Sequence, residues 1–178
     1  MKKLLFIFLI SFFSCINFLQ ANIFEAIQTR NIEWVKSCIN SGEKNSSYNL
    51  GMTPLHVAVI NNFYNAVVVL VEADVDIDAR DKEGCTPLYY AVKNGNDIIA
   101  NYLIDKNAFS SPRDEAGETP LYIATLNEFK PLCLLLLKEG ANPDDRSSGG
   151  STPREIASPR IKEMFEAEDA KHKRSKSE

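Results

Sequence analysis

The tetrapeptide Thr-Pro-Leu-x returns at one fixed interval along the chain, and this repeat constrains the fold more than any other feature of the sequence. Its copies begin at Thr53, Thr86, Thr119 and Thr152, the last with Arg154 in place of Leu. Two more columns keep the same register, because an Ala stands five positions after each Thr and a Gly stands two positions before it. Three columns in register indicate stacked copies of one supersecondary unit.

Each Thr-Pro pair predicts the start of a helix. A Thr hydroxyl suits the N-cap, where it accepts a hydrogen bond from a free backbone N–H, and Pro suits the first helical position. The Ala column then falls inside this first helix, where a side chain of one methyl group lets a neighbouring helix approach closely.

A second helix is expected after a short break in each copy. The breaks are Asn61-Asn62, Asn94-Gly95 and Asn127-Glu128, and the apolar segments that follow are 67–71, 98–104 and 132–137. We expect this second helix to be the more buried of the two. It ends at Asp74, Asn107 or Gly140, residue types that enter the left-handed conformation typical of helix C-termini. A polar turn then leads back to the next Thr.

This pattern resembles the ankyrin repeat, a unit of about 33 residues whose first helix starts with Thr-Pro-Leu-His, as at Thr53. The resemblance covers residues 22–168 and implies an all-α solenoid of stacked helix-turn-helix units with projecting hairpin loops. Asp81 and Asp114, each followed three positions later by Gly, match the family's hairpin tips. Tyr89 and Tyr122 replace His56 in the middle copies, which leaves open whether the family's hydrogen bonds from this His are kept there.

The copies at both ends depart from the pattern and are expected to be caps. The first copy lacks Thr-Pro and lies one position short of a full period before the next, and the last has Pro159 and one helix-like stretch at 161–167. Capping repeats need a polar outer face. The resulting organisation is an N-terminal capping repeat (22–52), three repeats (53–85, 86–118, 119–151), a C-terminal cap (152–168) and a disordered charged tail (169–178).

Positions 1–21 are typical of a secretory signal peptide. Lys2 and Lys3 precede an apolar run that reaches Leu19, and Ala21 supplies the small residue at a cleavage position. We therefore expect an exported protein, periplasmic or secreted. Two alternatives stay open: an uncleaved anchor, although the run is shorter than about 20 residues and is interrupted by polar residues, and lipidation at Cys15.

Charge and composition indicate an ordinary soluble protein that does not bind nucleic acid. The 178 residues are 44% hydrophobic and 25% charged. Removal of Lys2 and Lys3 leaves 18 basic and 24 acidic residues, a net charge of −6, which disfavours nucleic acid and anionic membranes. The short basic cluster at 171–176 is expected to be a solvated end, or else a weak electrostatic tether.

The remaining cysteines and histidines offer no catalytic constellation. Cys38 and Cys133 fall in second-helix core columns, too far apart to pair, and are expected to be inert buried thiols. Cys85 follows the hairpin Gly84 and is expected to be exposed, either as a partner contact or as an unused thiol. His56 has a structural place in the repeat and His172 lies in the tail. No metal, cofactor, small-molecule substrate or enzymatic activity is therefore expected.

The resemblance instead implies a monomeric, non-catalytic module that binds another protein through hairpin tips and first helices on its concave face. The alternative is a secreted effector acting on a target in another cell. The variable positions of those columns are the candidate contacts: Asn49, Leu50, Met52, Ile60, Asn61, Lys82, Glu83, Cys85, Lys93, Asn94, Glu115, Ala116, Glu118, Leu126 and Asn127. Leu50, Met52 and Ile60 form either an apolar contact patch or ordinary exposed apolar positions.

Overall fold

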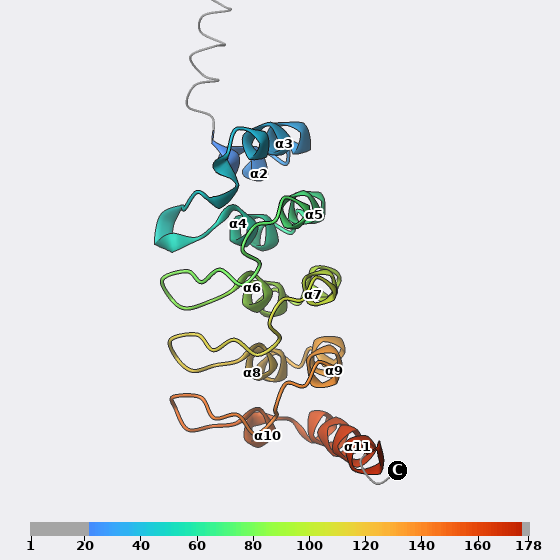
Figure 1. Cartoon of the computed structure of the whole chain (residues 1–178). Helices are drawn as coiled ribbons and strands as arrows, with labels where there is room; N and C mark the ends of the chain where they lie inside the picture. Colours follow the sequence, from blue (N-terminus) through green and yellow to red (C-terminus); the bar gives the residue numbers. More distant parts are fainter. Residues whose placement is uncertain (1–21, 176–178) are drawn as a thin grey trace, which may run out of the picture.

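The computed structural model describes residues 22–175 as a single stack of paired helices with hairpins projecting from one side (Figure 1). Within this range there is no strand, and no helix is long and apolar enough to cross a membrane. The all-α solenoid predicted from the recurring tetrapeptide is therefore confirmed. The expected signal peptide and the alternative at Cys15 lie outside the described residues.

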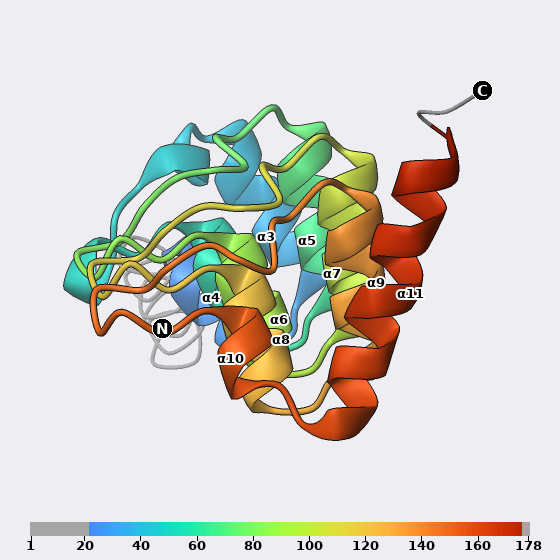
Figure 2. The same cartoon turned by 90° about the horizontal axis from the view of Figure 1, so that it is seen from below.

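Five helix pairs make up the stack. Their bounds are α2 (Ile23–Gln28) with α3 (Ile32–Asn40), α4 (Pro54–Ile60) with α5 (Tyr64–Glu72), α6 (Pro87–Lys93) with α7 (Asp97–Asp105), α8 (Pro120–Leu126) with α9 (Lys130–Lys138), and α10 (Pro153–Ile156) with α11 (Pro159–Ser175). Two short 3₁₀ turns, η1 (Glu43–Asn45) and η2 (Asn49–Gly51), lie between α3 and α4. The first helices form a column beside the hairpins. The second helices form another column, on the side of the first helices that faces away from the hairpins (Figures 1 and 2).

The Thr-Pro pairs start helices as predicted. Thr53, Thr86, Thr119 and Thr152 are N-caps whose side chains accept from the backbone N–H three positions on, and Pro follows at the first position. The predicted C-terminal residues of the second helices also take positive φ, at 59° for Asp74, 66° for Asn107 and 82° for Gly140.

The expectation that the second helix is the more buried one is wrong. All residues of α4 except Ile60 are buried, whereas α5 buries only Ala66, Val67 and Leu70. The first helices are more buried because each packs against the first helices of the neighbouring pairs and against its own second helix. The second helices lie on the outside of the stack and bury one stripe.

The C-terminal pair continues further than expected. The disordered tail predicted from residue 169 is wrong for 169–175, because α11 runs on to Ser175. Two ion pairs hold this part of the helix: Lys171 lies 2.6 Å from Glu168, and Asp169 lies 3.0 Å from Arg154. Arg154, the residue that replaces Leu in the last tetrapeptide, also pairs with Asp144 at 2.8 Å. The end of the stack therefore carries the polar cover that a cap needs.

Candidate interaction surface

The hairpins are joined edge to edge by a ladder of backbone hydrogen bonds. Lys82 N donates to Leu50 O at 2.8 Å, Glu115 N to Glu83 O at 2.9 Å, and Ser148 N to Ala116 O at 2.9 Å. The bonds repeat with the period of the sequence, so each hairpin tip is fixed by the one before it. We call this side of the stack the hairpin edge.

A column of arginines strengthens the hairpin edge. Each guanidinium donates to a carbonyl of its own hairpin, and the first two also donate to a carbonyl of the next hairpin. The bonds run from Arg80 to Gly84 and Arg113, from Arg113 to Gly117 and Arg146, and from Arg146 to Gly150. The sequence interpretation missed these arginines, although they recur with the same period as the Thr-Pro pairs, a signal that could have found them.

Asp81 closes the hairpin between α5 and α6 from inside. Its carboxylate is buried and accepts from the backbone N–H groups of Glu83 and Cys85, each at 2.9 Å, and from the Tyr90 hydroxyl at 2.7 Å. The expected Asp-x-x-Gly tip is thus a set of charge-assisted hydrogen bonds. Asp114 repeats part of it by accepting from Glu118 N at 2.8 Å.

Cys85 is not the exposed thiol that the sequence suggested. Only 4% of the residue is exposed, because its N–H is drawn to Asp81 and its carbonyl lies 3.1 Å from Nε2 of His56. Burial and the nearby carboxylates raise the pKa of this thiol to about 12. A thiol with such a pKa supplies almost no thiolate at neutral pH, so Cys85 is not suited to act as a nucleophile. Because it is buried, it is not a surface contact either.

The other two described cysteines are buried, as predicted. Cys38 is 4% and Cys133 0% exposed, and burial raises the pKa of both thiols.

His56 has the structural place that was expected of it. Its Nδ1 accepts from Thr53 N at 3.1 Å, which completes a capping box, and its Nε2 joins the next hairpin through Cys85 O. Burial lowers the pKa of this imidazole. At Tyr89 and Tyr122 the Thr side chain still accepts from the Tyr backbone, but within the described residues the reciprocal side-chain bond is not made.

Most candidate contact positions lie at the surface. Those that are exposed are Asn49, Leu50, Ile60, Asn61, Lys82, Glu83, Lys93, Asn94, Glu115, Ala116, Leu126 and Asn127. Met52 and Glu118 are half-buried, and Met52 packs against the core. The hairpin ladder brings Leu50 next to Lys82 and Glu83 next to Glu115 through their backbones.

The apolar trio expected in one repeat does not form one patch. Leu50 lies in η2 at the hairpin, and Ile60 is the last residue of α4. The α4 helix between them spans roughly 10 Å. Ile60 instead belongs to another surface on the opposite side of the stack.

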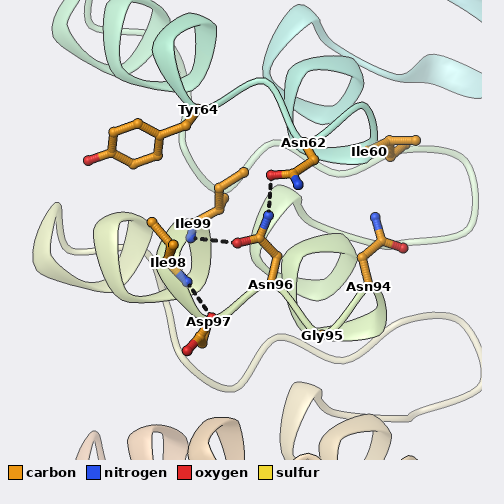
Figure 3. Close-up of a pocket in the computed structure, with 9 residues that line it drawn as sticks. All are labelled: Ile60, Asn62, Tyr64, Asn94, Gly95, Asn96, Asp97, Ile98 and Ile99. Carbon is orange, nitrogen blue, oxygen red and sulfur yellow. Dashed lines mark hydrogen bonds between the residues drawn. The ribbon is translucent and has the colours of Figure 1, made fainter.

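That surface is an open groove of about 780 Å³ where the α4–α5 turn faces the α6–α7 turn (Figure 3). We call it the turn groove, and the side of the stack that holds these turns the turn edge. The groove is lined by Ile60, Asn62, Tyr64, Asn94, Gly95, Asn96, Asp97, Ile98 and Ile99. It brings together two candidate residues, Ile60 and Asn94.

Ile98 shows why the sequence interpretation missed the turn groove. The sequence predicts it within an apolar segment of a buried helix, but 66% of it is exposed while its neighbour Ile99 is fully buried. Consecutive helical residues point about 100° apart, so one buried isoleucine turns the other outward.

Two family models match this chain. Residues 75–147 match a model of ankyrin repeats in three copies, and residues 41–91 match a model of ankyrin repeats in many copies. Together they span 41–147, more than half of the sequence. The chain belongs to the ankyrin-repeat family. No curated protein matched the sequence.

Ankyrin repeats are generally protein–protein interaction modules and are typically non-catalytic. Within the part of the chain that the structure describes, no group of three His, Cys, Asp or Glu side chains is placed to hold a metal ion. The matched residues exclude α2, α3 up to Asn40, and both terminal helices α10 and α11.

Proposed function

We propose that this ankyrin-repeat protein is a non-catalytic binding module that holds a partner protein on its hairpin tips and first helices. The observation that carries the proposal is the hairpin ladder, because backbone bonds of 2.8–2.9 Å fix successive tips at one spacing. A hairpin backbone that is already fixed loses little further freedom when a partner binds, which lowers the entropic cost of association.

The chemistry of the tips fits a protein surface better than a small molecule. Lys82, Glu83 and Glu115 present both signs of charge beside Leu50, which is 53% exposed. A partner covering several tips and first helices buries roughly 800 Å² on this side, the size of a specific interface.

The proposal places this binding outside the cytoplasm. The charge, apolar run and small residue of positions 1–21 support export. Helix α2 begins directly after the expected cleavage position, because Asn22 is its N-cap and accepts a hydrogen bond from Glu25 N. Cleavage after Ala21 would therefore leave this helix intact. Fractionation separates periplasmic retention from release, as expected of a secreted effector. Metabolic labelling with a fatty acid, compared with Cys15→Ser, tests lipidation.

The direct test reverses two charges and removes an apolar side chain at the hairpin tips, without removing the backbone hydrogen bonds that hold the hairpins together. We compare the full chain with a variant carrying Leu50→Asp, Lys82→Glu and Glu115→Lys, and measure which proteins of an envelope extract each captures. Captured proteins that depend on the binding face should be lost from the variant. Phe109→Asp is the matched control, because Phe109 is 57% exposed and lies outside the candidate positions.

Circular dichroism melting of each variant shows whether the fold is kept. Equal capture by the folded tip variant, the control and the original chain would remove the hairpin tips from the proposed interface. A photo-crosslinker at the exposed Glu83 then identifies the partner, a role for which the buried Cys85 is unsuitable.

A further inference from the structure

One column at the turn edge alternates between two residue types. Asn31, Phe63, Asn96 and Phe129 are the N-caps of α3, α5, α7 and α9. The two asparagines cap their helices with the side chain, whereas the two phenylalanines make no side-chain cap bond. The phenylalanine rings therefore do not cap the helix and are available to pack against a neighbouring helix pair.

Each ring packs against the turn of the preceding helix pair. Phe63 is buried, with the Arg30 guanidinium 4.9 Å from its ring centre. Phe129 lies so close to Gly95 that a Cβ added there would stand 3.0 Å from its Cζ. At the step between them Asn96 stands in this column, and its side chain bonds to Ile99 N and Asn62. No ring fills that step, and the turn groove opens there (Figure 3).

The groove exposes apolar side chains that are held in place. Ile60, Tyr64 and Ile98 are 37%, 39% and 66% exposed and all line it. The Tyr64 ring packs edge-on against Tyr102 at 5.5 Å between centroids, which fixes one wall. Its volume falls within the roughly 300–1,000 Å³ typical of ligand sites.

The polar lining is suited to a peptide backbone. Asn61 and Asn127 each donate from the side chain to a carbonyl four positions back, but Asn94, in the same column, makes no side-chain hydrogen bond among the side chains that the structure describes, 22–171. Its amide can both donate and accept. Asn62 and Asn96, joined at 2.6 Å, lie beside it.

Asp97 gives the groove its charge. It is the one ionisable carboxylate among the lining residues, and within the described chain it makes no ion pair. Cations do lie along the turn edge, but none of those described pairs with Asp97. Arg30 is bound through its two Nη atoms to the carbonyls of Asn61 and Asn62. Lys93, at the end of α6, has its Nζ over the Tyr89 ring, and Lys130 begins α9 at the next turn. A cationic group in the turn groove would therefore meet a carboxylate that accepts from Ile98 N at 3.1 Å but has no cationic partner.

We propose that the turn groove is a second binding site, which takes an extended peptide with an apolar side chain next to a Lys or Arg. The apolar side chain packs between Tyr64 and Ile98, the peptide backbone pairs with Asn94, and the cation approaches Asp97. This site is on the turn edge and does not depend on the hairpin tips.

The test uses the full chain, labelled with ¹⁵N, and three capped peptides at millimolar concentration. The probe is Gly-Ser-Leu-Arg-Ser-Gly, and the controls exchange Arg for Glu or Leu for Ser. We expect saturable shifts of the Asn62 and Asn94 side-chain amides and of the Ile98 backbone amide with the Leu-Arg peptide. Asp97→Asn should weaken this binding about two- to fivefold, and Ile98→Ser about tenfold.

Asn96→Phe is the decisive variant, because it copies the residue found at the neighbouring steps and should fill the groove and abolish the shifts. Phe109→Ser, exposed but outside the groove, should leave them unchanged. No saturable shift, equal binding of the Leu-Glu peptide, or binding that survives Asn96→Phe would each overturn the proposal. If Asn96→Phe does not fold, the test rests on Ile98→Ser, and unchanged binding of the Leu-Arg peptide by that variant would overturn the proposal. The hairpin-tip variant should bind the peptide normally, so the two proposals fail separately.

Discussion

The two edges of this stack join neighbouring helix pairs in different ways. At the hairpin edge the same backbone N–H to carbonyl bond recurs at each of the three junctions, and an arginine crosses the second and the third. At the turn edge every step differs: Arg30 covers Phe63, Asn96 binds Asn62, and Gly95 packs on Phe129.

The difference separates the residues that hold the stack from those that are free to specify a function. A contact that recurs in every repeat must satisfy the same geometry each time, and a change there disturbs neighbours on both sides. A contact that changes from step to step is under no such constraint. The hairpin backbones are therefore scaffold, whereas their exposed side chains and the turn groove are available for recognition.

The largest effect should come from Asp81, the most bonded carboxylate of the hairpin edge. Asp81→Ala leaves two backbone N–H groups and the Tyr90 hydroxyl without their acceptor in a buried place. We expect the free energy of unfolding to fall by about 3–5 kcal/mol, measured by urea denaturation. Asp97→Ala at the turn edge should cost under about 1 kcal/mol. Similar losses at both sites would show that the edges do not differ.

A smaller loss of stability is expected from alanine at the hairpin glycines, and comparing two of them separates the cost of close hairpin packing from that of backbone strain. Gly117 and Gly150 both have positive φ, 69° and 85°, but a Cβ at Gly117 would lie 2.9 Å from Ser148 N, and one at Gly150 would meet nothing within 4 Å. Both changes to Ala add strain of about 1–2 kcal/mol. Gly117→Ala should cost about 1–2 kcal/mol more, because the next hairpin must move. Equal melting temperatures of the two variants would contradict a close hairpin contact.

The third effect is pH dependence at His56, which joins two hairpins. Burial lowers the pKa of His56 in the folded chain below its usual value of about 6.5. Protonation then favours the unfolded state, so this stability is fully present above that value and is lost as the pH falls towards the folded pKa. The melting temperature should decline from pH 7.5 to 5.5 more steeply in the original chain than in His56→Tyr, which copies Tyr89 and Tyr122. Parallel declines would exclude His56 as the cause.

The architecture could be predicted from the sequence because the scaffold repeats. Thr-Pro starts, left-handed helix ends and Asp-x-x-Gly tips are local signals with a fixed period, and each was found where expected. The burial of the two helices was predicted wrongly, since an apolar run does not show which column a helix joins. The first helices are hidden by neighbours in the stack, which no local pattern records.

The site was harder to predict because it depends on contacts between repeats. The place of Cys85 beside a turn Gly predicts an exposed thiol, but hydrogen bonds to Asp81 and His56 hold its backbone inside the hairpin. The turn groove arises from a missing ring rather than from a motif. Its only sequence signal is the alternation of Asn and Phe between positions 31 and 129, which becomes meaningful once Phe129 is seen against Gly95.

The smallest expected effect on stability is that of Asn96→Phe, and it tests directly whether the turn edge tolerates change. The variant loses the α7 cap, which costs about 1 kcal/mol, and the bond to Asn62. It gains a ring that can pack beneath that turn, as Phe63 does beneath Arg30, and burial of such a ring contributes about 1.5–3 kcal/mol. Because the two terms are of similar size and opposite sign, the unfolding free energy should change by less than about 1 kcal/mol, measured in urea. A loss as large as that of Asp81→Ala would mean that Asn96 is part of the scaffold and that the turn edge is no freer than the hairpin edge.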